Sequence, residues 1–142
     1  MFNRGRAAVV IVVCGLALAG CGGDKSDAKQ TNEPACKTFQ TQMNKYLALM
    51  AAGKGTMTLP QYNQTLKDGV ADLDKISLTA AGDVKDRISA VVGQLPPDEP
   101  RSVTYSGATG RAFNNGLQRV ETACEADGFK IAVDRLKYNP IG

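Results

Sequence analysis

Apolar residues in the first half of the chain recur at steps of three and four positions, the spacing that places side chains on one face of a helix. The first such stretch begins after Pro34, a residue tolerated in a first helical turn, and ends at Gly53 and Gly55. Its apolar positions are Cys36, Phe39, Met43, Tyr46 or Leu47, and Met50. The pattern predicts one amphipathic helix in this stretch.

A capping box marks the start of a second helix. Thr58 and Gln61 have the spacing at which each side chain bonds the backbone of the other residue. Met57 and Tyr62 are spaced to form a hydrophobic staple across the same turn. The apolar face then continues through Leu66, Val70, Leu73 and Ile76. These features predict a helix that begins just after Thr58.

Two further helical patterns follow. The third consists of Ala81, Val84, Ile88, Val91 and Leu95, and the fourth of Phe113, Leu117, Val120 and Cys124. Pro96 and Pro97 end the third, and residues 96–107 read as a long loop. Gly128 is expected to end the fourth helix, because glycine favours the position just after a helix. Because residues 114–116, Asn-Asn-Gly, disfavour helix, we expect a kink or a later helix start there.

Four amphipathic helical patterns in succession predict a mainly α fold, a small antiparallel four-helix bundle over residues 34–128. The last segment, residues 129–142, fits no single period. Phe129, Ile131 and Val133 alternate as in a strand, but Leu136 and Tyr138 break that alternation. Packing along the bundle is our default for this segment, with contact to a membrane surface or to a partner left open.

The N-terminus has the zones of an export signal. Arg4 and Arg6 precede an apolar run over residues 7–18, which is too short to span a bilayer. The sequence Leu18-Ala19-Gly20-Cys21 then resembles the lipobox of bacterial lipoprotein precursors. The resemblance implies that residues 1–20 are a signal peptide that is removed. It also implies that Cys21 is lipidated and anchors the chain to the extracytoplasmic face of the cell membrane.

The residues after Cys21 contain no aromatic or branched aliphatic side chain up to position 33, so residues 21–33 are interpreted as a lipidated flexible tether. Without Arg4 and Arg6, the 17 basic residues of the chain become 15, against 14 acidic residues. This near-neutral charge argues against nucleic acid as a partner, because that binding needs a concentrated basic surface.

Two cysteines remain once the signal peptide and the lipidated thiol are set aside. An exported pair is most simply a disulfide, and an antiparallel bundle brings Cys36, at the start of the first helix, to Cys124, at the end of the fourth. Free thiols or pairing between chains are the alternatives. The chain has no histidine, which removes histidine-based catalysis and histidine-ligated zinc. We therefore predict no enzymatic activity, no metal site and no cofactor.

One loop has the composition of a binding site. Arg101, Tyr105 and Arg111 bracket hydroxyl residues and glycines that suit an anion or a glycan, although a solvated connector is the simpler reading. The leading hypothesis is a non-enzymatic interaction module that binds an envelope protein. In one specific version, the module inhibits that protein. In another, a phage places the module on its bacterial host, where it excludes other phages. The alternative is a carrier of an apolar small molecule or lipid between the helices, suggested by Met43, Met50 and Met57 and by the long loop over residues 96–107.

Overall fold

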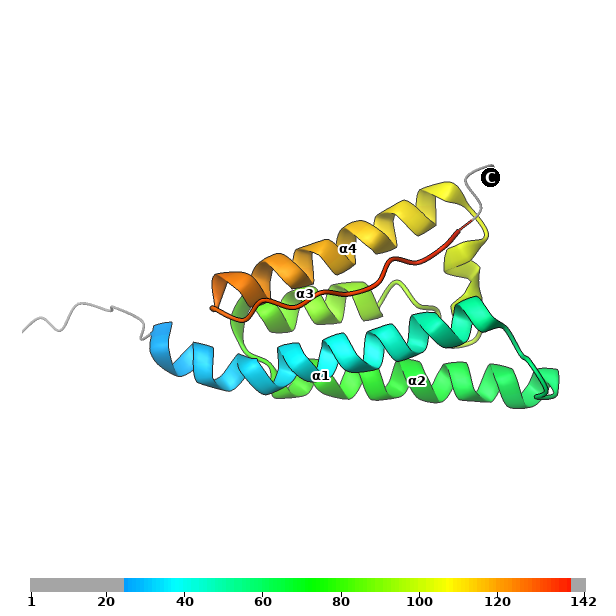
Figure 1. Ribbon diagram of the computed structural model, residues 1–142, viewed down its shortest axis with the longest axis horizontal. Coiled ribbons are helices and arrows are strands. Elements are labelled where there is room, and N and C mark those ends of the chain that lie inside the picture. The colour runs from blue at the N-terminus through cyan, green and yellow to red at the C-terminus, as the bar shows by residue number, and fades with distance from the viewer. Residues whose placement is uncertain (1–24, 139–142) are drawn as a thin grey trace, which may run out of the picture.

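The computed structural model describes residues 25–138 (Figure 1). Its elements are α1 (Lys25–Ala52), α2 (Leu59–Thr79), α3 (Gly82–Val92), the short 3-10 helix η1 (Pro100–Thr104) and α4 (Gly107–Ala126). The described residues form no strand, so the prediction of a mainly helical fold with four helices is confirmed. The predicted signal peptide and Cys21 lie outside the described residues. Among the helices that are described, none is both long and apolar enough to cross a bilayer.

The first helix begins earlier than the sequence indicates. It starts at Lys25 and runs through Pro34, which lies inside it rather than in its first turn. Asn32 is buried, and its side chain bonds the backbone of Ala81 and the carboxylate of Asp127. The predicted boundary between tether and domain, at residue 33, is therefore too late. The polar composition of this stretch concealed the one asparagine that three hydrogen bonds fix to the domain.

The start of α2 agrees with the capping motif predicted from the sequence. The Thr58 hydroxyl accepts from the Gln61 N–H, and the Gln61 side chain accepts from the Thr58 N–H at 2.9 Å, so the predicted capping box is confirmed. Met57 packs against the core beside this turn. The third helix ends at Val92, three residues before Leu95.

The fourth helix contradicts the expectation of a kink or a late start at residues 114–116. It begins at Gly107, where the Ser106 hydroxyl accepts from the Thr109 N–H, and it continues without a break to Ala126. Gly116 lies where a side chain would approach Val91 Cγ2 to 2.9 Å, so its lack of one lets α3 and α4 pack closely. The predicted loop over 96–107 is also interrupted by η1. Gly128, with φ of +96°, ends the helix as expected.

Each helix packs against its neighbour in the chain: α1 on α2, α2 on α3, and α3 on α4 (Figure 1). The first and last helices approach each other much less closely. One continuous apolar core lies between the helices, and its largest fully buried members are Tyr62, Phe39, Phe113, Met43, Leu66, Leu73, Ile88 and Leu117. Helical spacing identified every one of these residues from the sequence.

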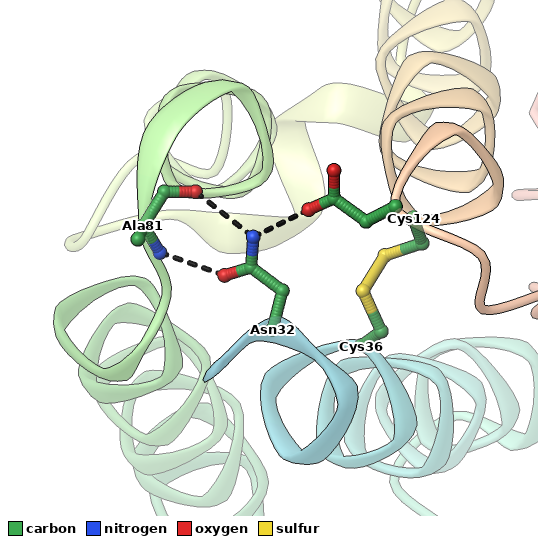
Figure 2. The surroundings of a disulfide bond; sticks show 5 residues. Asn32, Cys36, Ala81 and Cys124 are labelled. Atoms are coloured by element: carbon green, nitrogen blue, oxygen red, sulfur yellow. Dashed lines mark hydrogen bonds between the residues drawn. A yellow bond between two sulfur atoms is a disulfide. The ribbon is translucent and has the colours of Figure 1, made fainter. Parts of the chain in front are cut away.

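Cys36 and Cys124 form a disulfide that joins α1 to the last turn of α4 (Figure 2). The pairing is as predicted, but Cys36 lies well inside α1, which begins at Lys25, and not at its start. Asn32 lies one turn before Cys36 and donates to the Asp127 carboxylate and to the Ala81 carbonyl. Its own carbonyl oxygen accepts from the Ala81 N–H at 2.8 Å. The disulfide and the three hydrogen bonds of the Asn32 side-chain amide thus connect α1, the α2–α3 junction and the end of α4 at one end of the domain.

Candidate functional site

The clearest site in the described residues is the groove between α1 and α4. An extended segment, residues 129–138, leaves the end of α4 and runs back along it in the opposite chain direction (Figure 1). We call this segment the strap. It has neither helical nor strand structure, and it covers the seam at which α1 and α4 pack less closely than helices that are neighbours in the chain. Of the placements left open for this segment, packing along the bundle is therefore the one observed for residues 129–138.

Two asparagines hold the strap by its main chain. Asn44, on α1, donates to the Ala132 carbonyl and accepts from the Asp134 N–H at 2.8 Å. Asn114, on α4, donates to the Leu136 carbonyl at 3.1 Å and accepts from its N–H at 2.8 Å. A side-chain amide that bonds the N–H and the carbonyl of one residue presents the same groups as a neighbouring β-strand. The two helices thus recognise extended backbone through side chains.

A carboxylate on α4 adds a third contact. Glu121 accepts from the Val133 N–H at 2.7 Å and binds the Arg135 guanidinium through both of its oxygens. Partial burial opposes the charge on Glu121, but the bonds from Arg135 and Val133 outweigh burial and lower the pKa of the carboxyl. Glu121 is therefore held as an anion that favours a basic residue two positions after the amide it binds.

Three apolar side chains of the strap are buried, namely Ile131, Val133 and Leu136. Their neighbours Lys130, Ala132, Asp134 and Lys137 are exposed. At the far end, the Tyr138 ring lies against Gly110 of α4, where an added Cβ would come within 2.2 Å of the ring. The strap thus contacts the helices through its backbone, its buried apolar side chains, the Arg135 guanidinium and the Tyr138 ring.

The strap does not fill the groove completely. A hollow of about 430 Å³ lies beside it at the end of α1, lined by Leu47, Met50, Thr104 and the strap residues from Asp134 to Lys137. Its walls combine aliphatic surface from α1 with polar groups from the strap. This hollow is continuous with the groove, because Leu136 lines the one and is anchored in the other.

The loop predicted to bind a ligand is only partly assembled. Arg101 lies over the Tyr62 ring at 5.8 Å from its centroid, and the Tyr105 hydroxyl donates to Glu99 at 3.0 Å. Arg101 and Tyr105 line a hollow of about 250 Å³ together with Asp98 and Glu99, so acidic groups offset the guanidinium there. Arg111 is exposed on α4 and does not line this hollow. The three residues therefore do not converge on one anion site.

The methionines and the space between helices bear on the carrier hypothesis. Met43 is fully buried, while Met50 is partly buried against the core. A separate hollow of about 370 Å³ lies between α1 and α2, lined by apolar surface of Tyr46, Leu49 and Gly69. The Tyr46 hydroxyl is buried and has no hydrogen-bond partner among the described residues, and burial raises the pKa of its phenol.

Residues 25–138 contain no group of three or more acidic or thiol side chains placed to hold a metal ion. The acids that recur along the helices instead form surface ion pairs, such as Asp72 with Lys75 and Asp83 with Arg87. The lipidation site, Cys21, lies outside the described residues and remains a prediction.

Sequence reasoning missed the three residues that build the groove, namely Asn44, Asn114 and Glu121. One signal was present: asparagine at position 114 is unfavourable inside a helix, so its placement in the middle of α4 requires another reason. Asn44 and Glu121 carry no comparable mark, because polar residues on a helix surface are ordinary.

No protein-family model matches the chain, and no curated protein and no solved structure matches it either. The groove must therefore be interpreted from its own geometry.

Proposed function

We propose that this chain is a lipoprotein anchored by lipid on Cys21 to the extracytoplasmic face of the cell membrane, where it acts as a non-enzymatic module that binds an envelope protein. The single observation that supports the binding role is the groove between α1 and α4. Its polar groups bond main-chain atoms of an extended segment, which is a recurring way for proteins to take up peptides. The lipobox and the apolar run before it support the anchor.

For this role we take the four helices as a small antiparallel bundle. Packing of each helix on its chain neighbour and the Cys36–Cys124 bond both suit that arrangement. The anchor would then lie on the side of α1 where the disulfide and Asn32 fix the helix end. A domain held this way presents its groove to neighbouring envelope proteins within reach of the tether.

The test starts from intact-mass measurement of the wild type and of Cys21→Ala expressed in a bacterial host. We expect a wild-type mass that begins at residue 21 and includes acyl chains, and loss of those chains in the variant. Membranes are then solubilised and the wild type is isolated with its bound proteins. A specific, stoichiometric envelope protein supports the proposal, and an unlipidated wild type without a partner contradicts it.

The second candidate is a carrier for an apolar small molecule or lipid, which the hollow between α1 and α2 favours. It presents apolar surface beside the buried Tyr46 ring. Native mass spectrometry of the purified protein should then show a retained ligand of a few hundred daltons. A mass equal to that of the protein alone, at native fold, would remove this candidate.

A further inference from the structure

We infer that the groove between α1 and α4 is the partner-binding site itself, and that it takes an extended segment of the partner in place of the strap. The inference rests on the proposed binding function and names its site and ligand. The segment we propose has apolar residues at three positions spaced as Ile131, Val133 and Leu136 are, and a basic residue just before the last.

The contacts of the strap set this chemistry. Asn44, Asn114 and the Val133-binding oxygen of Glu121 all bond main-chain atoms, which any extended protein segment supplies. The features that select side chains are the three apolar seats, the carboxylate that binds Arg135, and Gly110, which leaves room for the Tyr138 ring. The groove thus tolerates many sequences while requiring extended backbone, an apolar pattern and one positive charge.

The contacts that hold the strap also allow it to leave the groove. Residues 130–138 form no hydrogen bond with the main chain of any other described segment, so every polar contact that holds them runs through a side chain. The strap lies beyond Cys124, outside the loop that the disulfide closes, and it is joined to α4 through Gly128. Its departure therefore breaks neither the disulfide nor any main-chain hydrogen bond of the four helices.

A covalently attached occupant competes strongly with any partner. A segment on a short linker has an effective concentration of about a millimolar at its own site. A partner segment present at micromolar concentration binds only when its contacts are better, or when the strap is weakened. The strap is thus a built-in competitor that sets the affinity threshold of the groove.

The experiment uses the full chain, purified from detergent-solubilised membranes, and a fluorescein-labelled peptide with the sequence of residues 129–138. In one variant, Val133→Asp and Leu136→Asp together release the strap. We expect this variant to bind the peptide at least tenfold more tightly than the wild type does, by fluorescence anisotropy. Adding Asn114→Ala should weaken that binding at least tenfold, while adding Asn115→Ala, a neighbouring exposed amide, should leave it unchanged.

Variants of the peptide test which of its side chains the groove selects. Replacing the three apolar residues by Asp should abolish binding, and replacing Arg135 by Ala should weaken it several-fold. Alanine at the exposed positions 130, 134 and 137 should change it less than threefold. Equal binding of all these peptides would overturn the inference, as would absence of binding to a released variant that keeps its helical circular dichroism.

A second measurement covers the case in which the released variant does not fold. Hydrogen exchange in the wild type should show the Val133 and Leu136 amides opening at least a hundredfold more often than the Leu117 and Val120 amides of α4. Equal protection of strap and helix would overturn the inference, because the strap would then leave only on global unfolding. Sedimentation that shows reciprocal strap exchange between two copies would overturn it too, since the occupant would be this chain itself.

The peptide experiment needs no envelope partner. If the membrane isolation recovers no partner while the peptide binds as expected, the proposed function is wrong, but the groove is still a site that binds an extended segment. The reverse result, a partner that binds equally well to the wild type and to an Asn114→Ala variant, places the partner elsewhere on the surface.

Discussion

The α3–α4 and α1–α4 seams of this domain are closed in different ways. At the α3–α4 seam, two helices meet directly, and Gly116 removes the side chain that would keep them apart. At the α1–α4 seam the helices pack less closely, a disulfide closes one end, and an extended segment lies along the remaining length. Direct packing gives a seam that opens only when the domain unfolds. A seam filled by a separable segment can open while the helices stay folded, and for this reason binding is more readily built there.

The largest effect is expected when the disulfide is removed. The double variant Cys36→Ala, Cys124→Ala should lower the free energy of unfolding by about 4–5 kcal/mol, because the bond closes a loop of 88 residues. Urea unfolding of both proteins, with and without reductant, measures the difference. Reductant should lower the stability of the wild type only. A loss under about 1 kcal/mol would mean that the α1–α4 seam holds without the bond.

Asparagine 114 tests the strap contact itself. Asn114→Ala removes both hydrogen bonds to Leu136 and should lower the free energy of unfolding by about 1–2 kcal/mol relative to Asn115→Ala. The control carries the same gain in helix propensity but touches no strap residue. Urea unfolding gives the difference, and equal stabilities of the two variants would show that the strap adds nothing to the folded state.

Acidification should loosen the strap before it unfolds the helices. The pKa of Glu121 is lower in the folded protein than in the unfolded chain, so its contribution is complete above the unfolded value of about 4.3. That contribution is lost as the pH falls through the lower folded value. We expect the Val133 amide signal in NMR spectra to shift towards its free position below about pH 4. Glu121→Gln should abolish this shift, whereas Glu125→Gln, an exposed acid on the same helix, should retain it.

The smallest effect is expected at the directly packed α1–α2 seam. Tyr46 lies tightly against Gly69 there, and its hydroxyl has no partner among the described residues. Tyr46→Phe removes this buried polar group, so the free energy of unfolding should stay the same or rise by up to about 1 kcal/mol. Thermal unfolding at neutral pH provides the measurement. A clear loss of stability would indicate that water reaches this hydroxyl in solution.

The sequence was most informative where one element could be read by itself. The capping box at Thr58, the helical spacing of the core and the glycine that ends α4 all depend on residues a few positions apart. The pairing of Cys36 with Cys124 followed because only two thiols remained once the predicted signal peptide and Cys21 were set aside.

Contacts between distant residues were the part that the sequence did not reveal. Asn32 looked like tether because its partners, Ala81 and Asp127, are distant in the chain. Asn114 looked like a helix breaker because the strap that it binds begins beyond the end of α4. In both cases, a residue that is locally unfavourable or neutral is retained by a partner that local patterns do not identify.

The position of the disulfide has a mechanical consequence. When tension is applied between a point before Cys36 and a point after Cys124, the force passes through the sulfur bridge and bypasses α2 and α3. The chain between the cysteines, a sequence separation of 88 residues or about 300 Å when extended, stays shielded from the load. A pull on the C-terminal side would peel the strap from its groove first. In a protein held at its N-terminal side to a membrane, that sequence of events would turn tension into exposure of the groove.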